Sequence, residues 1–306
     1  MIAFHHTKHP SYDGATGWIN SEPLRPESLQ GSVVLTQFWT FTCINWLRTL
    51  PYVRAWSEAY AGDGLVVVGV HTPEFEFEHD VDRVQHAVEE MRIAYPVALD
   101  PDYAVWTAFS NHYWPALYLA DMDGVLRYEH FGEGRYEETE RAVQQLLGID
   151  RQLVAVAGQG AEAAADWDDL RSPETYLGTE RSDRPTNGAP DGLRLNEWSL
   201  SGDWTRHAQG AVLEEAGGSI AFRFHARDLH LVMGPEDDGN DVRFRVLLDG
   251  EPAGAAHGVD VDEQGLGTAT ERRMHQLIRQ PGRIEDRTFE IQFLDAGVGA
   301  YVFTFG

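Results

Sequence analysis

The most reactive side chain in this sequence belongs to its only cysteine, Cys43. It follows an apolar, β-branched and aromatic run over residues 33–39, which predicts a buried strand. Apolar residues then recur at helical spacing, and Thr40 and Thr42 can cap the start of that helix. A thiol in the first turn of a helix faces unpaired backbone N–H groups and the positive end of the helix dipole. Both favour the thiolate, which is the nucleophilic form of cysteine.

The residues around Cys43 resemble the active site of thioredoxin-fold proteins. Phe38 and Trp39 stand where that family has its Phe-Trp, and Pro51 stands where it has the proline that kinks the active-site helix. The family motif is Cys-x-x-Cys, whereas this chain has Trp46 in place of the second, resolving cysteine. One chain alone therefore cannot cycle between a dithiol and an internal disulfide. It can form a mixed disulfide or a sulfenic acid, and turnover then requires an outside thiol.

Cys43 and Trp46 each have two interpretations. A free cysteine is often a small buried hydrophobe, but here the strand, the cap, the helix and the spacing to Pro51 agree. We therefore expect a surface-accessible, functional or recently functional thiol. Trp46 either fills the space of a smaller side chain in an inactive redox site or shields one side of Cys43. In the second case it joins Trp39 and Trp114 in an apolar groove for an unfolded peptide or a thiol ligand.

An X-Pro pair, Trp114-Pro115, directly precedes an apolar run of strand character. A thioredoxin fold has its cis-proline at this point, so the resemblance implies a cis bond between Trp114 and Pro115. Propensity alone would not predict it, because only about 5–6% of X–Pro bonds in folded proteins are cis. The resemblance further implies that this loop packs against Cys43 and offers backbone groups to a bound peptide or thiol.

Three further polar residues could act on Cys43. Thr40 lies three residues before it, which resembles the Thr-x-x-Cys of peroxiredoxins, although the proline of that signature is Thr36 here. Glu74 follows a predicted strand end beside the site and is either a proton acceptor or a helix-capping acid. Arg48 either lowers the pKa of Cys43 through space or is simply solvated.

The composition limits the partners and the compartment. The chain has 306 residues and a formal charge of −25, which argues against nucleic acid and anionic membranes and suits cationic or neutral partners. No motif indicates a cofactor, and we expect no metal site at His5, His6 and His9, since a flexible tail holds ligands poorly. With no disulfide framework, signal core or spanning apolar run, we expect a cytoplasmic protein. A piece of a longer secreted or membrane-anchored chain would look the same.

The first half, residues 1–148, alternates predicted strands and helices. The order is strand, helix, strand, helix, strand, helix, strand, strand, helix, which predicts an α/β sheet with helices on both faces. One of these helices is acidic and is expected over residues 78–91. The insertion before Pro115 is most similar to the redoxin branch of the thioredoxin-like proteins, which includes the AhpC/TSA and TlpA-like groups. The segments FWTFTCIN, GVHTPEFEFE, YPVALD, YWPALYL and FGEGRYEETE resemble the soluble part of DipZ-type proteins. That resemblance implies a thioredoxin-like domain followed by a carbohydrate-binding-module-like sandwich.

The second half has a different character. Residues 149–190 are rich in Ala, Gly and turn residues, which predicts a linker. Over residues 191–306 the hydrophobic period is two, and Asp249-Gly250 predicts a hairpin turn. Short strands separated by turns predict an antiparallel, jelly-roll-like β-sandwich. Its aromatic residues are either core or a sugar-stacking platform, for which the candidates are Tyr176, Trp198 and Trp204.

Three functions are compatible with these patterns. The first is thiol-disulfide exchange, in which Cys43 forms mixed disulfides, the Trp114–Pro115 loop positions the partner, and an external thiol or disulfide-bearing protein completes the reaction. The second is a single-cysteine peroxidase in which Thr40 assists Cys43. The third is a non-catalytic binding or scaffold protein whose redoxin domain is degenerate and whose sandwich binds carbohydrate or a protein. Whether the chain is an enzyme stays open, because the resolving cysteine is missing.

Overall fold

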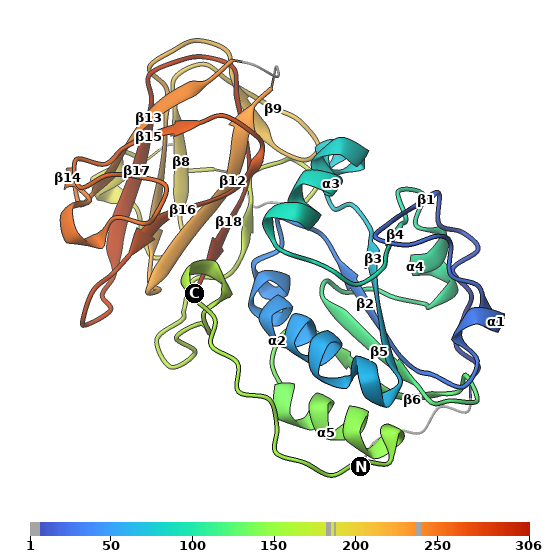
Figure 1. Ribbon diagram of the computed structural model, residues 1–306. Helices are drawn as coiled ribbons and strands as arrows, with labels where there is room; N and C mark the ends of the chain where they lie inside the picture. Colours follow the sequence, from blue (N-terminus) through green and yellow to red (C-terminus); the bar gives the residue numbers. More distant parts are fainter. Residues whose placement is uncertain (1–6, 182–184, 187, 237–239) are drawn as a thin grey trace. The chain divides into compact units, whose positions relative to one another are not determined.

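The computed structural model describes residues 7–181, 185–186, 188–236 and 240–306. The chain divides between Ala163 and Ala164 into two compact units. The first unit is an α/β domain, and the second is built of β-strands (Figure 1). No helix in these described ranges has both the length and the apolar composition needed to cross a membrane.

The first unit is organised on a mixed β-sheet with the spatial order β1-β4-β3-β2-β5-β6. β2, β3 and β4 are parallel, whereas β1, β5 and β6 run antiparallel to their neighbours. Every residue of the central strand β2 is buried, as expected for a strand covered on both faces. The strand bounds are β1 (Gly17–Ile19), β2 (Val33–Trp39), β3 (Leu65–His71), β4 (Val97–Leu99), β5 (Ala116–Ala120) and β6 (Leu126–Phe131).

Helices cover both faces of this sheet (Figure 1). On one face, α2 packs on β3, α5 packs on β2 and β6, and Arg54 of α2 donates a hydrogen bond to the carbonyl that ends α3. On the other face, the apolar residues of α1 and α4 join side chains such as Val34, Phe38 and Tyr118 in one cluster. The helix bounds are α1 (Pro26–Leu29), α2 (Ile44–Tyr60), α3 (Val81–Glu90), α4 (Ala104–Ala108) and α5 (Tyr136–Leu147).

From β2 to α5 the predicted order of strands and helices is confirmed, with one helix start placed wrongly, whereas β1 and α1 precede that order. The helix expected over residues 78–91 begins at Val81, because Asp80 is its N-cap and accepts a hydrogen bond from the N–H of Asp82 at 2.9 Å. Residues Glu76–His79 form a separate 3-10 helix, η2. Glu78 therefore belongs to the loop after β3 rather than to α3, and this places its side chain near Cys43.

The second unit consists of antiparallel strands in two sheets. One sheet has the order β16-β12-β18-β10-β9 with β7 beside β18, and the other has β14-β13-β17-β11-β8 with β15 beside β13. The strands are β7 (Thr175–Tyr176), β8 (Trp198–Ser201), β9 (Trp204–Arg206), β10 (Ala211–Leu213), β11 (Ser219–Phe224), β12 (Asp228–Pro235), β13 (Val242–Leu248), β14 (Glu251–Pro252), β15 (Leu266–Ala269), β16 (Arg273–Arg279), β17 (Arg287–Phe293) and β18 (Val298–Phe305).

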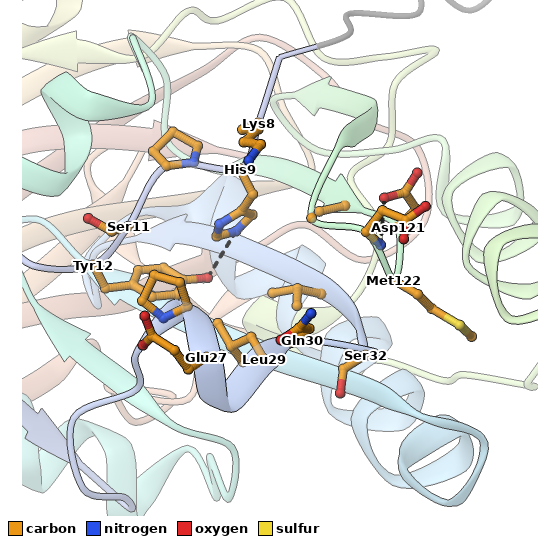
Figure 2. A pocket seen from close by; sticks show the side chains of 16 residues that line it. Lys8, His9, Ser11, Tyr12, Glu27, Leu29, Gln30, Ser32, Asp121 and Met122 are labelled. Atoms are coloured by element: carbon orange, nitrogen blue, oxygen red, sulfur yellow. Dashed lines mark hydrogen bonds between the residues drawn. The ribbon is translucent and has the colours of Figure 1, made fainter.

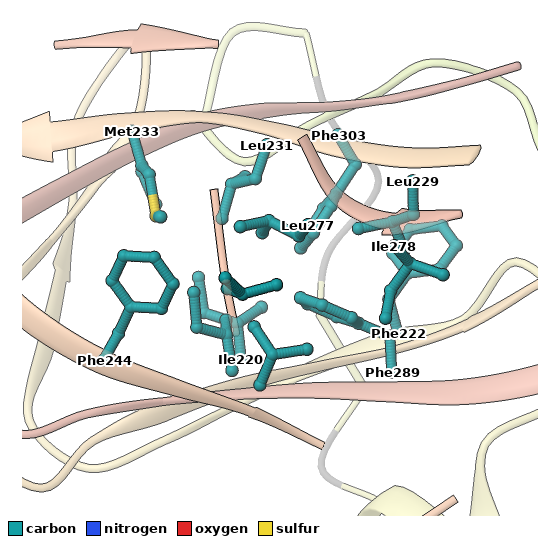
Figure 3. Packing of buried hydrophobic residues seen from close by; sticks show 14 of the residues in the cluster. Ile220, Phe222, Leu229, Leu231, Met233, Phe244, Leu277, Ile278, Phe289 and Phe303 are labelled. Carbon is teal, nitrogen blue, oxygen red and sulfur yellow. The ribbon is translucent and has the colours of Figure 1, made fainter. Parts of the chain in front are cut away.

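The two sheets face each other across an apolar core, so the second unit is a β-sandwich (Figure 3). Phe222 of one sheet contacts Phe303 of the other, with ring centroids 5.1 Å apart. The predicted hairpin is confirmed as well. Leu248 pairs with Glu251, and Asp249 and Gly250 both have positive φ values, of 53° and 83°, as a tight type I′ turn requires.

The aromatic residues considered for sugar stacking do not form an exposed platform. Trp198 is part of the sandwich core and is only 2% exposed. Trp204 packs partly against that core and donates its Nε1–H to the carbonyl of Ser201 at 3.0 Å. The alternative interpretation, that these tryptophans are core residues, therefore holds for Trp198.

The segment expected to be a linker, residues 149–190, is shared between the two units. The N–H of Val154 donates to Glu140 at 2.7 Å, and Glu162 forms an ion pair with Arg54, so this part packs on the first unit. Further along, Ser172 accepts a hydrogen bond from the N–H of His225 at 2.8 Å, and β7 extends a sheet of the sandwich. The exact bounds of the two domains and the linker stay a prediction.

We predict that Gly69→Ala destabilises the first unit. A Cβ at Gly69 would lie 2.8 Å from Nε1 of the buried Trp39 and 3.1 Å from the ring of Tyr95. Overpacking of this kind costs about 1–3 kcal/mol. Gly62→Ala is the matched control, because a Cβ there meets nothing within 4 Å. Urea unfolding followed by tryptophan fluorescence should show an earlier transition for Gly69→Ala alone, and an equal shift in both variants would contradict this packing.

Candidate active site

Cys43 lies where β2 passes into α2. The strand ends at Trp39, a tight turn follows, and the N–H of Cys43 donates to the carbonyl of Thr40 at 3.3 Å. Cys43 is itself the N-cap residue of α2, and its carbonyl accepts the N–H of Leu47 at 3.0 Å. The expectation that Thr40 or Thr42 caps this helix is wrong. The thiol, rather than a hydroxyl, therefore stands at the positive end of a long helix.

The loop before β5 lies against the sulfur of Cys43. The Trp114–Pro115 peptide bond is cis, and Sγ of Cys43 lies 3.8 Å from the carbonyl oxygen of Trp114. Trp114 is held in turn by a hydrogen bond of 3.0 Å from its Nε1 to the carbonyl of Thr72. On the other side, the N–H of Gly132 donates to the carbonyl of Pro115 at 2.8 Å. The structure thus brings Cys43, Trp114 and Pro115 together.

Buried Asn111 also fixes this loop, and sequence reasoning missed it. Its amide donates to the carbonyl of Tyr113 at 3.1 Å, and its side-chain oxygen accepts the hydroxyl of Tyr118 at 3.1 Å. The signal that could have found it is an Asn four residues before a proline loop, a residue type that often bonds to nearby backbone. Asn111 therefore positions the backbone that approaches the thiol.

The expectation of a surface-accessible thiol is wrong for this conformation. Cys43 is only 7% exposed. The Trp114 carbonyl lies on its sulfur, and the apolar side chains of Phe41 and Ile44, both nearly fully buried, flank it in the chain. A reagent can reach Cys43 only through a narrow opening or after a small movement of these neighbours.

Trp46 points into the protein interior and is fully buried. Its ring stacks on the ring of Trp39, with centroids 4.3 Å apart and planes inclined by 20°. Trp39 also meets the ring of buried His71 edge to face, at 4.9 Å. The interpretation of Trp46 as part of an apolar groove does not fit Trp39 and Trp46, because both are core residues. The interpretation of Trp46 as a large side chain that fills the space at the resolving position fits this packing.

A buried carboxyl group, Glu78, lies beside the turn that carries Cys43. The hydroxyl of Thr42 donates to its Oε1 at 2.7 Å, while the N–H groups of Glu74 and Phe75 donate to its Oε2 at 2.7 and 3.0 Å. Burial raises the pKa of Glu78 above its ordinary value, and the Thr40 and Thr42 hydroxyls act against that rise. Burial thus opposes the charged form of Glu78, while the donors to its two oxygens favour that form.

The sequence offers Glu74 as either a proton acceptor or a helix-capping acid, but Glu78 occupies the buried position. Glu74 is half-buried and contributes its backbone N–H rather than a carboxylate to the Glu78 cluster. The usable signal was the spacing of Phe75 and Glu78, since an acid three residues after a helix N-cap reaches back to the N-cap N–H. The acidic run around it concealed this spacing.

Arg48 is neither solvated nor exposed. It forms an ion pair of 2.9 Å with Glu133, and the two side chains are only 3% and 8% exposed. Burial raises the pKa of Glu133, and the neighbouring Arg48 cation acts against that rise. Because Glu133 directly follows Gly132, this ion pair joins α2 to the loop that bonds Pro115. Arg48 is thus a structural tie across the site.

No group of three His, Cys, Asp or Glu side chains in the described part of the chain is arranged to hold a metal ion. Of the N-terminal histidines, His5 and His6 lie outside the described residues. His9 packs against the first unit and bonds to Thr36 at 2.9 Å.

We predict that Glu78→Gln reduces the pH dependence of stability. A carboxyl group whose pKa is raised on folding keeps its proton in the folded chain while the unfolded chain loses it, so stability falls as pH rises above the ordinary value of 4.5. Glutamine has no proton to lose. The urea midpoint should therefore fall less between about pH 5 and about pH 8 in Glu78→Gln than in the unaltered chain. Glu76→Gln, at a side chain 86% exposed, is the control; equal pH slopes in all three proteins would refute the assignment.

Known proteins share both halves of this chain. The family described as "Thioredoxin like C-terminal domain" matches residues 172–306. Protein DipZ of Mycobacterium tuberculosis (strain CDC 1551 / Oshkosh) is 34% identical over 97% of this chain, which spans only 42% of DipZ. Thiol-disulfide oxidoreductase YkuV of Bacillus subtilis (strain 168) is 31% identical over 45% of this chain and 93% of its own length.

Solved structures that resemble the chain cover about half of it. The solution structure of a thioredoxin-like protein in the oxidized form has 31% sequence identity and a TM-score of 0.44, and the match covers 47% of this chain and 96% of that chain. The nearly complete coverage of YkuV at 31% identity decides the assignment. The chain belongs to the thioredoxin-like family of thiol-disulfide oxidoreductases.

Proposed function

We propose that this protein exchanges thiols and disulfides through Cys43 by way of mixed disulfides. The observation that carries the proposal is the position of Cys43 at the N-cap of α2 with its sulfur 3.8 Å from the carbonyl oxygen that precedes cis Pro115. The helix end stabilises a thiolate. The backbone of the Trp114–Pro115 loop supports the proposal as the surface that would hold the partner chain.

The proposed reaction has two exchange steps. The Cys43 thiolate attacks one sulfur of a partner disulfide, a bond forms between the two sulfurs, and the other partner sulfur leaves as a thiolate. An external thiolate then attacks the partner sulfur of the mixed disulfide and releases Cys43 as a thiolate. Electrons balance, because one disulfide is consumed and one is formed.

Trp46 determines how the mixed disulfide is resolved. A thiol at this position could attack the mixed disulfide from within the chain, but a buried indole ring cannot. The mixed disulfide therefore lasts until an outside thiol arrives. The reaction thus needs two partners. One is a disulfide-bearing protein or a small disulfide, and the other is a separate thiol. Both kinds of partner can be supplied on either side of a membrane.

A second candidate function is that of a binding protein on an inactive thioredoxin scaffold. Two observations favour it, the 7% exposure of Cys43 and the complete burial of Trp46 at the resolving position. The peroxidase hypothesis requires the hydroxyl of Thr40 to assist Cys43. It gains less support, because the group of Thr40 that contacts Cys43 in the turn is its backbone carbonyl. Whether the Cys43 thiol reacts in the folded protein distinguishes thiol-disulfide exchange from the scaffold function.

We predict that native protein reacts with one equivalent of 5,5′-dithiobis(2-nitrobenzoate) and keeps the mixed disulfide until a thiol is added. The reaction rate should rise with pH to a plateau set by a thiolate pKa below about 8.5, the value of an ordinary cysteine. Absorbance of the released thionitrobenzoate measures both rate and stoichiometry, and Cys43→Ser gives the background. If Cys43 reacts only after unfolding in urea, exchange is excluded and the scaffold function remains.

We predict that Trp46→Cys restores internal resolution. The variant has the Cys-x-x-Cys spacing, so the second thiol should displace the bound reagent and release two thionitrobenzoates for each chain. Removing a buried tryptophan costs about 3–5 kcal/mol, so the variant should also unfold earlier. Trp46→Ala is the control with the same loss of packing and no second thiol. Release of one equivalent from folded Trp46→Cys would mean that the position does not face the mixed disulfide.

A further inference from the structure

A cavity of about 310 Å³ lies in the first unit at the end of the sheet remote from Cys43 (Figure 2). Three segments far apart in the sequence form it: residues 8–12, α1 with the residues after it, and residues 120–124. Ser32 and Val34 at the start of β2 also line it, whereas Cys43 follows the other end of this strand. From Val34 to Trp39 the strand is about 16 Å long at 3.3 Å for each residue.

The walls of the cavity are tied to one another. The N–H of His9 donates to the carbonyl of Gly124 at 2.8 Å, and the N–H of Gly31 donates to the carbonyl of Met122 at 3.1 Å. These bonds join the N-terminal segment and the end of α1 to the same turn. Asp121 closes that turn by accepting the N–H of Val125 at 2.9 Å. The cavity is therefore formed before any ligand enters it, as small-molecule sites usually are.

Two lining residues, His9 and Tyr12, form a closed polar group with the fully buried Thr36, which does not itself line the cavity. Tyr12 and Thr36 bond to each other at 2.6 Å, and both bond to Nε2 of His9, at 3.2 and 2.9 Å. Burial lowers the pKa of His9 to about 4, so its ring is neutral at ordinary pH. The adjacent surface is apolar, with Leu29 and Val34 in the interior and Met122, 42% exposed, at the opening.

We propose that this cavity binds a neutral, two-ring aromatic molecule. Its size supports two rings, because a dry cavity of about 150 Å³ holds benzene. Its charges support a neutral ligand, since the lining carries both the chain's only lysine, Lys8, and the carboxyl groups of Glu27, Asp121 and Asp123. An anion would meet these carboxylates and a cation would meet Lys8. The rings of Tyr12 and His9 line the cavity, and an aromatic ligand can pack against them.

This site is independent of the thiol chemistry proposed for Cys43. None of the residues that line the cavity belongs to the turn of Cys43 or to the Trp114–Pro115 loop. Cys43→Ser should therefore leave binding unchanged, and loss of the exchange function would not remove the site.

Indole is a suitable neutral two-ring probe. With ¹³C-methyl methionine, indole should shift the Met122 signal saturably and leave Met91, Met233 and Met274 in place, because Met122 is the methionine that lines the cavity. Calorimetry then gives the affinity. Leu29→Trp fills the cavity and should weaken binding about tenfold or more, whereas Val81→Trp, at an exposed position of α3, should not.

A second variant covers the case in which Leu29→Trp fails to fold. Met122→Asp, at a partly exposed residue of the opening, should also weaken indole about tenfold by placing a charge beside the apolar wall. The proposal is overturned if Met122 does not shift up to the solubility limit of indole. It is equally overturned if all methionines shift alike, or if a folded Met122→Asp binds as tightly as the unaltered chain.

Discussion

The stack of Trp46 on Trp39 is the interaction on which the candidate site depends. It fixes the first turn of α2 against the end of β2. The turn that carries Cys43 connects these two elements, because residue 43 comes after Trp39 and before Trp46 in the sequence. The same stack needs Gly69 in the neighbouring strand, because any side chain there would meet the indole of Trp39. The place that a second thiol occupies in a Cys-x-x-Cys protein is thus part of the hydrophobic core.

Buried ionisable groups hold the loops around this stack. Arg48 and Glu133 join α2 to the loop that bonds Pro115, and Glu78 organises the turn after β3 through three donors. Removing one partner of such a group leaves the other unsatisfied, which costs more than the bond itself contributes. These contacts therefore hold the loops against the turn that carries Cys43, where the Trp114 carbonyl covers the sulfur.

Local patterns predicted the architecture well, because the order of elements follows from hydrophobic periodicity and turn residues. The strand before Cys43, the helix after it and the hairpin at Asp249-Gly250 all have such local signals. The errors concern side chains whose environment is set by distant segments. Cys43 is covered by a loop 71 residues away in the sequence, and Arg48 finds Glu133 85 residues later. Glu78 was concealed within an acidic run in which Glu76 and Asp80 are exposed and Glu74 is half-buried.

Trp46 also determines how the proposed exchange would depend on the concentrations of thiol and disulfide outside the protein. When a dithiol protein closes an internal disulfide, it consumes one small disulfide and releases two small thiols, so its oxidised fraction depends on the total thiol concentration. A protein with one thiol exchanges one thiol for one disulfide. Its mixed-disulfide fraction depends only on the ratio of disulfide to thiol outside. Dilution of both by the same factor would leave it unchanged, so a chain with Trp46 in this place would report a ratio rather than an amount.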